Sequence, residues 1–589
     1  MIILSDKEDQ FKPSTPDPHF DVTAPNSNPL VASLPAVVTK TESAFEVSWD
    51  QESGPEEPAN AGSVLQQISD QAKRDTLRFP GSARAHANFG AALAKAARVD
   101  EAVYELEIAL SIEPNDYLAG VTLARVYVNN GNYDKARQLY EDLLRYHPKN
   151  DSILLSLAYL SLRSGNYAAA EEHLRTVLKL KKSDAFPHFL LGITRLQIGN
   201  LHGAVSALKE AARIDVHRAE FHHALGVAYV MVGDLGRAER AFCTAFSLSP
   251  NTPGPVHALS NVLIKQGQPV SALEYIRPYV ESHPNDIEAR DILANAYFDT
   301  GQYAHARAHL QAAVQIGGEK LACHVRSRLL TNIAATHLLE GKIGPAEGEL
   351  NRAIELAPRS LSIPYEYLAR IRVRAEEWDS AKEILENATR LFPDQQSLRR
   401  LLAGVHALLD SYDLAIADLR PLYDQGIAEP ETYSALGSLY EWTGDYDSAL
   451  RVLTEAYSRS PKSLPIINNL AYTHLMAGQV DAARSVLKSL PRSSKPHAEL
   501  IATQGLLRIW EGDRTQGRLL YERAEQMASS SGNRDLARRV RQKKYLELAK
   551  DSVRRGDLVG GRLEIERGLS IRVEASSFKA KLEELLRKL

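Results

Sequence analysis

The sequence predicts an all-α protein built as one long solenoid of repeated segments, and three observations carry this prediction. Seven segments that begin at residues 83, 117, 151, 185, 219, 253 and 287 follow one another at a constant spacing of 34 residues. A small residue recurs at position 8 of most of these segments and alanine at position 20 of all of them. Glycine near position 15 and proline at position 32 often punctuate them. A fixed period of this kind is typical of stacked repeats that share one continuous core.

The composition excludes several other classes of protein. Of 589 residues, 44% are apolar and 24% charged, and the net charge is only −4, so nothing global indicates nucleic acid or membrane binding. Cys243 and Cys323 form no CxxC motif or metal-finger spacing, which favours a reducing compartment. The first residues, MIILSDKEDQ, do not resemble a signal peptide, and no apolar run approaches the ~20 residues of a membrane span. We therefore expect a cytoplasmic protein without a membrane span.

The chain is expected to begin with a disordered tail, residues 1–62. This segment is rich in proline, serine and threonine and holds eleven acidic residues against three lysines, a net charge of −8. Such a segment cannot bury enough apolar surface to offset its ordering entropy. Within it, Phe45, Val47 and Trp49 alternate with polar residues. We interpret Phe45 and Trp49 either as chance apolar residues or as a docking motif for a partner or for the protein's own groove. If the motif docks onto the protein's own groove, the tail would control the access of partners to that groove.

Residues 63–82 predict an N-terminal capping helix, and residues 83–320 hold repeats one to seven. Six extra residues, 321–326, interrupt the register before repeats eight to thirteen, residues 327–531. The eleventh repeat is the most regular, with Gly437, Tyr440, Ala449, Ala456 and Pro461 at its key positions. These segments closely resemble tetratricopeptide repeats, whose period is also 34 residues. The resemblance extends over roughly 83–570 and implies two antiparallel helices, A and B, in each repeat, stacked into a right-handed superhelix.

The repeat positions have simple physical roles. Small residues at positions 8 and 20 let helices A and B approach closely, and position 27 packs against helix A of the next repeat. Proline at position 32 stops helix B. Glycine at position 15 ends helix A, because glycine adopts the left-handed cap conformation at little cost. The glycines at this position are Gly131, Gly165, Gly199, Gly233, Gly267, Gly301, Gly341, Gly444, Gly478 and Gly512.

The C-terminal end of the array is less regular. Residues 532–571 are expected to hold an insert and a degenerate fourteenth repeat, with Ala549, Gly561 and Gly568 at small-residue positions. Residues 572–589 end in the amphipathic stretch SFKAKLEELLRKL, which predicts a terminal helix that covers the last exposed interface.

The resemblance also implies where partners bind, because helix A of each repeat lines the concave groove through positions 2, 5, 9, 12 and 13. In repeats two to five these positions are apolar, which suits an amphipathic helix or an apolar peptide of a partner. The alternative is that they pack against neighbouring helices. In repeats seven to nine the groove is charged or polar, and the alternative there is an ordinary solvated face. The predicted groove residues are Leu118, Val121, Leu155, Tyr159, Phe186, Phe189, Ile193, Val227, Met231, Asp291, Asn295, Arg370 and Arg374.

Two specialised kinds of tetratricopeptide domain are not supported. No three consecutive repeats carry the lysine, asparagine and arginine set that grips a C-terminal carboxylate, and no asparagine ladder of the glycosyltransferase type is present. The sequence also lacks a P-loop, a Rossmann glycine fingerprint, HExxH and GxSxG. We therefore predict no catalytic residues, no cofactor and no enzymatic activity.

Histidines recur at positions 4 and 5 of successive A helices, namely His188, His222, His223 and His257. Equivalent positions of neighbouring repeats lie about one helix diameter, ~10 Å, apart. Ligands that share one metal ion must each reach it over ~2 Å, so these histidines are expected to be interface residues.

The C-terminal end is basic through Arg538, Arg539, Arg541, Lys543 and Lys544. Such a run can bind nucleic acid, anionic lipid or an acidic partner, and its plain alternative is a solvated helix face. The favoured function is a protein-interaction scaffold or adaptor that assembles or regulates a complex. One alternative is a non-catalytic subunit of an enzyme complex that acts on envelope polysaccharides or modifies proteins. The other is an RNA-associated repeat protein that uses this basic end, although few aromatic residues accompany it for base stacking.

Overall fold

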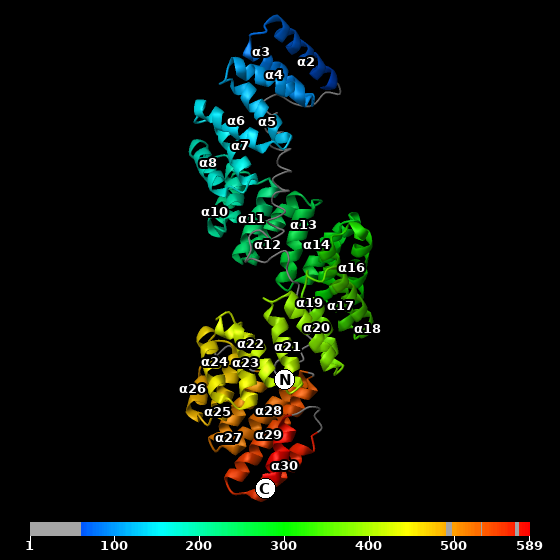
Figure 1. Ribbon diagram of the computed structural model, residues 1–589, viewed down its shortest axis with the longest axis vertical. Coiled ribbons are helices and arrows are strands. Elements are labelled where there is room, and N and C mark those ends of the chain that lie inside the picture. The colour runs from blue at the N-terminus through cyan, green and yellow to red at the C-terminus, as the bar shows by residue number, and fades with distance from the viewer. Residues whose placement is uncertain (1–60, 491–496, 532, 572–576, 589) are drawn as a thin grey trace. The chain divides into compact units, whose positions relative to one another are not determined.

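The computed structural model describes residues 61–490, 497–531, 533–571 and 577–588, and every regular element within these ranges is a helix (Figure 1). The prediction of an all-α repeat protein is therefore confirmed. The tail motif residues Phe45 and Trp49 lie outside the described residues. The described chain divides into two compact blocks, which we call the N-terminal block, residues 61–318, and the C-terminal block, residues 319–588.

The N-terminal block begins with one single helix, which seven helix pairs follow. Its helices are α2 (Ala61–Arg78), α3 (Ala83–Lys95), α4 (Val99–Ile112), α5 (Tyr117–Asn129), α6 (Tyr133–Tyr146), α7 (Asp151–Arg163), α8 (Tyr167–Leu180), α9 (Ala185–Gln197), α10 (Leu201–Ile214), α11 (Ala219–Val232), α12 (Leu235–Leu248), α13 (Pro253–Lys265), α14 (Pro269–Ser282), α15 (Ile287–Asp299) and α16 (Tyr303–Gly317). The odd-numbered helices from α3 on are the A helices of successive repeats, and the even-numbered ones are the B helices.

The C-terminal block continues the same alternation and ends in a single helix. A short 3-10 helix, η3 (Gly318–Lys320), precedes its first α-helix. Its helices are α17 (Cys323–Leu339), α18 (Ile343–Leu356), α19 (Ile363–Arg374), α20 (Trp378–Leu391), α21 (Gln396–Leu408), α22 (Tyr412–Asp424), α23 (Pro430–Thr443), α24 (Tyr446–Arg459), α25 (Leu464–Met476), α26 (Val480–Lys488), α27 (Ala498–Trp510), α28 (Arg514–Ser530), α29 (Arg534–Arg554), α30 (Leu558–Leu569) and α31 (Ser577–Lys588).

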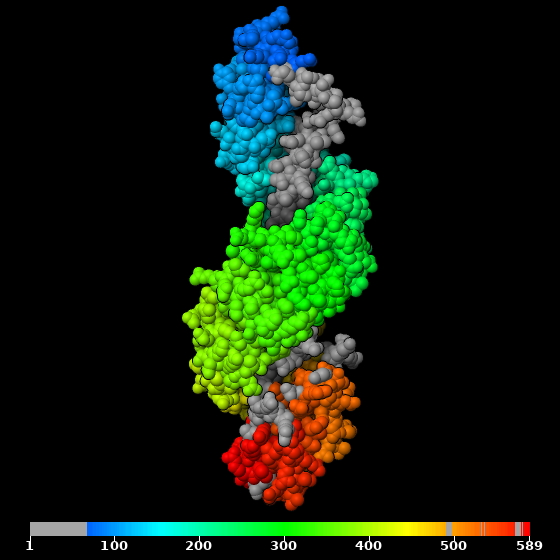
Figure 2. Space-filling model, turned by 90° about the vertical axis from the view of Figure 1, so that its right-hand side faces the viewer, coloured from blue at the N-terminus to red at the C-terminus, as the bar shows by residue number. Residues whose placement is uncertain are grey.

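Each helix packs against the helix before it and the helix after it in both blocks, and neighbouring A helices also contact one another, as α3 contacts α5 and α23 contacts α25. Within each block, these contacts extend the apolar core from one repeat into the next. Side chains fill the spaces that the ribbon leaves between neighbouring helices (Figure 2).

The turn between helices A and B has the same backbone conformation throughout. All ten glycines predicted at position 15 have a positive φ, between 74° and 91°. Among the residues that the structure describes, three non-glycine residues also have a positive φ, namely Ala97 (55°), Glu376 (59°) and Asp410 (53°). They occupy position 15 of the first, ninth and tenth repeats, which lack the glycine. The fold therefore imposes the left-handed conformation at this position even on residues that disfavour it.

Small residues occupy the closest approach of the two helices within a repeat. A Cβ atom added at Gly192 would lie 2.4 Å from Cγ of Leu208, and one added at Gly437 would lie 2.7 Å from Leu453. Ala449, at position 20, has no exposed surface. These contacts confirm that positions 8 and 20 must stay small for helices A and B to pack at this distance.

The two ends of the array are covered by single helices. Ala72 of α2 packs with Phe89 and Leu93 of the first repeat. Leu582 of α31 is fully buried and packs with Leu546 and Ile565 of the last repeat. The extra residues of the sequence lengthen A helices: α17 begins four residues before the regular start at Ser327, and α29 runs for 21 residues.

Candidate partner-binding surface

We define the A-face as positions 2, 5, 9, 12 and 13 of the A helices, where the sequence predicts partner contacts. In the N-terminal block, the structure leaves four predicted apolar residues of the A-face at least partly exposed. Leu118 of α5 is 44% exposed, and Leu155 and Tyr159 of α7 and Phe186 of α9 are half-buried. These four side chains come from three successive A helices, so together they extend along the stacking direction of the repeats.

The other five predicted apolar residues of the A-face are buried: Val121, Phe189, Ile193, Val227 and Met231. Phe189 of α9 packs with Phe221 of α11 at a ring-centroid distance of 4.9 Å, and with Phe186 at 6.2 Å. Position alone therefore does not decide exposure, because neighbouring A helices approach closely enough to enclose large side chains. Of the polar pair on α15, Asp291 is buried and Asn295 is half-buried.

The four histidines have two different roles. His188 and His222 each contact, through Nε2, the backbone carbonyl six residues earlier, at 3.2 and 3.0 Å, and so fix the loop before their helix. His223 and His257 are buried on the neighbouring helices α11 and α13. Burial lowers the pKa of His223 to about 4, and the charge of His257 adds to this effect. Across the described residues, no group of three metal-binding side chains is close enough to hold a metal ion.

His257 clamps one repeat to the next through two carboxylates. Its Nε2 atom lies 3.3 Å from Oδ2 of Asp286, and its Nδ1 atom lies 3.5 Å from Oε2 of Glu288. Asp286 also caps α15 by accepting a hydrogen bond from the amide of Ala289. Burial by itself would lower the pKa of His257, but the two carboxylates raise it to about 9. Similarly, burial would raise the pKa of Asp286, and the contact with His257 lowers it to about 2.

In the C-terminal block, the A-face carries arginines. Arg370 of α19 is half-buried and Arg374, one turn later, is exposed. Burial lowers the pKa of Arg370, and the guanidinium groups of Arg374 and Arg400 act in the same direction. Arg400 of α21 was not among the predicted groove residues, although it occupies position 5 of its repeat. It forms an ion pair of 2.6 Å with Glu429 and donates a hydrogen bond to Thr432.

The predicted basic residues of α29 do not form one exposed patch. Arg541 forms an ion pair with Glu525 of α28, and the buried Lys544 lies 3.6 Å from the same carboxylate. Lys543 lies on another side of the helix, with its ammonium group 3.8 Å from the ring centroid of Tyr472. Burial lowers the pKa of Lys543 to about 8. Arg538 is exposed and Arg539 is half-buried. The cations of α29 therefore lie on different sides of the helix, some beside Glu525 and one on the ring of Tyr472.

Comparison with known families agrees with this architecture. Models of the tetratricopeptide repeat match residues 93–145, 121–185, 368–430 and 443–506. A model described as anaphase-promoting complex, cyclosome, subunit 3 matches residues 235–313. The chain belongs to the tetratricopeptide-repeat (TPR) family. TPR proteins generally act as scaffolds for protein interactions and not as enzymes.

Similar proteins and structures share parts of the chain. Mouse tetratricopeptide repeat protein 21A is 26% identical over 256 residues, which are 42% of this chain and 18% of that protein. The TPR protein YrrB, whose peptide-binding site is described as unusual, is 22% identical over 34% of this chain and 98% of its own, with a TM-score of 0.29. Yeast Tom70 is 15% identical over 74% of this chain and 94% of its own, with a TM-score of 0.34.

A TPR protein from Parabacteroides merdae is 14% identical over 43% of this chain and 98% of its own, with a TM-score of 0.36. No helix among the described residues is both long and apolar enough to cross a membrane.

Proposed function

We propose that this TPR protein is a non-catalytic scaffold that holds an apolar segment of a partner protein on the A-face of its N-terminal block. The observation that carries the proposal is the alignment of Leu118, Leu155, Tyr159 and Phe186 on successive A helices. Neighbouring packed helices lie about 8–10 Å apart. An amphipathic helix presents apolar side chains at comparable intervals, one or two turns apart, so its apolar face can meet several of these side chains at once.

The chemistry of this surface favours binding over catalysis. Its part-exposed residues are aliphatic or aromatic, and they supply contact area rather than a nucleophile or a general base. The arginines of the A-face in the C-terminal block provide a second, charged surface. The partners then assemble along the array, each on a chemically distinct part of it.

A double variant that places charges on the A-face tests the proposal. Leu118→Glu with Leu155→Glu places two charges on the A-face without filling the packed interior, and full-length protein is compared with this variant by affinity purification and mass spectrometry. Val270→Glu in α14 is the control, because Val270 is 64% exposed and lies on a B helix of the same block. A peptide from a partner so identified is then titrated against each purified protein.

We expect binding of that peptide to weaken at least about tenfold in the A-face variant, because a charge at an apolar contact costs more than 1.4 kcal/mol, and to be unchanged in the control. Melting curves check that both variants fold. If the folded A-face variant retains every partner of the wild-type protein at unchanged affinity, the proposed surface is wrong.

A further inference from the structure

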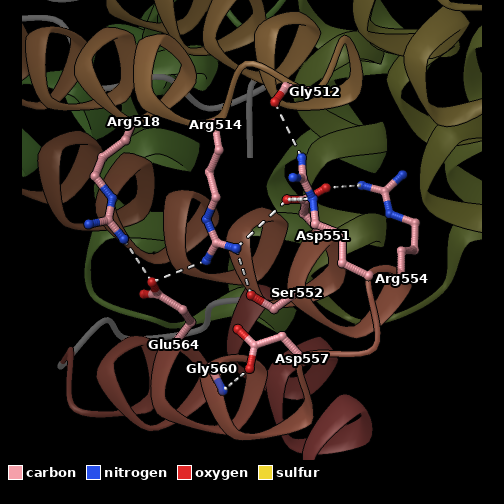
Figure 3. A network of polar contacts seen from close by, with 10 residues as sticks. Gly512, Arg514, Arg518, Asp551, Ser552, Arg554, Asp557, Gly560 and Glu564 are labelled. Carbon is pink, nitrogen blue, oxygen red and sulfur yellow. Dashed lines mark hydrogen bonds and ion pairs between the residues drawn. The ribbon is translucent and has the colours of Figure 1, made fainter.

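Five arginines surround two buried carboxylates where the last two repeats meet, on helices α28, α29 and α30. Figure 3 shows three of them, Arg514, Arg518 and Arg554, beside Asp551 and Glu564. The carboxylates are those of Asp551 and Glu564, whose side chains are only 8% and 6% exposed. The five arginines, which we call the arginine cluster, are Arg514, Arg518, Arg554, Arg555 and Arg567.

Glu564 of α30 receives three of these guanidinium groups. Arg518 donates a hydrogen bond of 2.7 Å to Oε1 of Glu564, and Arg514 donates one of 3.5 Å to the same oxygen. Arg567, on the same helix as Glu564, approaches the second oxygen to 3.7 Å. The carboxylate is therefore enclosed by cations from both helices of the contact.

Asp551, near the end of α29, receives the remaining groups. Nε of Arg555 lies 2.9 Å from Oδ2, while Arg514 and Arg554 approach to 3.8 and 4.0 Å. Arg514 thus contacts both carboxylates, and it also donates a hydrogen bond of 2.8 Å to Oγ of Ser552. Through Arg514, the two carboxylates and all five guanidinium groups form one connected network.

The charges of this network do not cancel. Arginine keeps its positive charge at every accessible pH, so five guanidinium groups against two carboxylates leave an excess of three positive charges. Four of the five side chains are between 41% and 49% exposed, so their outer N–H groups face solvent. The buried carboxylates hold the guanidinium groups in place, which lowers the entropy lost when an external anion binds to them.

We propose that the arginine cluster binds a short acidic segment of a partner protein, one that presents two or three neighbouring carboxylates. This inference adds a second contact, of opposite chemistry, to the scaffold function proposed above, and it concerns a different surface in the other block. Carboxylates match the planar guanidinium fork and form charge-assisted hydrogen bonds with it. A segment of this charge balances the excess of the cluster.

The surroundings favour an acidic peptide over nucleic acid. The ring of Trp510, the aromatic side chain beside the cluster, is covered by the guanidinium group of Arg554 at 4.3 Å from its centroid, so it is not open to a base. Exposed carboxylates of Asp513, Asp557 and Glu566 stand on the same helices and turns. These carboxylates confine the cationic surface to the cluster itself, which favours a short anionic segment over a long polyphosphate backbone.

The test measures the binding of a fluorescein-labelled hexaglutamate peptide to the full-length protein by fluorescence anisotropy. Hexaglutamine controls for charge, and deca-uridine RNA tests the nucleic-acid alternative. The variant Arg518→Gln with Arg567→Gln removes two exposed arginines of the cluster. The control, Arg523→Gln with Arg562→Gln, removes two exposed arginines from the same helices, α28 and α30, and neither contacts Asp551 or Glu564 in the structure.

We expect the cluster variant to weaken hexaglutamate binding about tenfold or more, since each lost charge-assisted contact contributes on the order of a tenfold change, and the control to stay within about twofold. Arg554→Gln is the second variant, because its ion pair with Asp551 is the longest of the cluster, at 4.0 Å, and we expect it too to weaken hexaglutamate binding. Equal weakening in cluster and control variants, absence of hexaglutamate binding, or displacement of hexaglutamate by deca-uridine would overturn the proposal. If only the binding of partners to the A-face proved wrong, the proposal for the arginine cluster would still stand.

Discussion

His223 and His257 lie on neighbouring A helices, and their pKa values shift in opposite directions from the ordinary histidine value of 6.5. The pKa of His257 is about 9 and that of His223 about 4. A difference of one in pKa corresponds to about 1.4 kcal/mol. The raised pKa of His257 therefore adds on the order of 3 kcal/mol to the local free energy of unfolding at acidic pH, and the lowered pKa of His223 removes a similar amount once the pH has fallen to 4.

The signs of the two contributions differ. The pKa of His257 is raised on folding, so its contribution is complete below pH 6.5 and is lost as the pH rises towards 9. The pKa of His223 is lowered, because burial disfavours its charged form, so its contribution is complete above pH 6.5 and is lost as the pH falls towards 4. The stability of repeats five to seven therefore peaks near pH 6.5 and declines on both sides.

The surrounding groups do not remove this maximum. Asp286, with its pKa of about 2, stays ionised throughout the range. Burial and the charge of Asp286 raise the pKa of Tyr279, whose ring packs edge-on against His257, to about 12. His283 stacks on the ring of Tyr279 at a centroid distance of 4.3 Å and does not contact His257 in the structure.

Amide hydrogen exchange of the segment from α11 to α15 measures this effect locally, which is appropriate because a repeat array does not unfold as one unit. Protection free energies, corrected for intrinsic exchange rates, are followed from about pH 4 to pH 9. We expect His257→Gln to flatten the alkaline decline and His223→Leu to flatten the acid one. His202→Gln, an exposed histidine of α10, leaves both unchanged. Wild-type protection that stays level between pH 6.5 and 9 would refute the reasoning.

Two further predictions concern the repeat positions. Ala449 has no exposed surface, so Ala449→Asp buries an unpaired carboxylate. We expect the amides of α23 to α25 to lose several kcal/mol of protection in hydrogen exchange. An unchanged melting curve would contradict the assigned repeat register. Glu376→Gly relieves a positive φ of 59° and should stabilise the ninth repeat by about 1 kcal/mol in urea unfolding, while Gly341→Ala, at φ 76°, should destabilise the eighth by a similar amount. If both variants changed the free energy of unfolding in the same direction, the left-handed turn would not be the cause of the change.

The sequence predicted the repeat register and the helix pairs because both depend on short-range interactions. Position 15 illustrates this: glycine was expected wherever the turn is left-handed, and Ala97, Glu376 and Asp410 adopt the same turn without it. The sequence could not show that these three residues are strained, since no local signal replaces the missing glycine. The terminal helix was similarly visible from its own apolar spacing, and Leu582 is buried against the last repeat.

Which side chains remain on the surface was decided by the tertiary structure. Leu118 and Phe189 both occupy A-helix positions expected to face a partner, yet one is 44% exposed and the other is fully buried against Phe221. The difference depends on how closely consecutive A helices approach, which is a property of the stack and not of any single repeat. The exposure of charged side chains also depends on the tertiary structure. Arg541 of α29, for example, is paired with Glu525 of α28, the last helix of the preceding repeat.

By itself, then, the sequence determined the period, the turn conformation and the small residues of each helix contact, since all of these act within one repeat of 34 residues. Only the tertiary structure decided which chemistry the repeats bring together. The contact of His257 with Glu288 crosses a repeat boundary, and Arg514 meets Glu564 from 50 residues away. Such contacts depend on the angle and distance between neighbouring repeats, and these follow from the packing of many side chains at once.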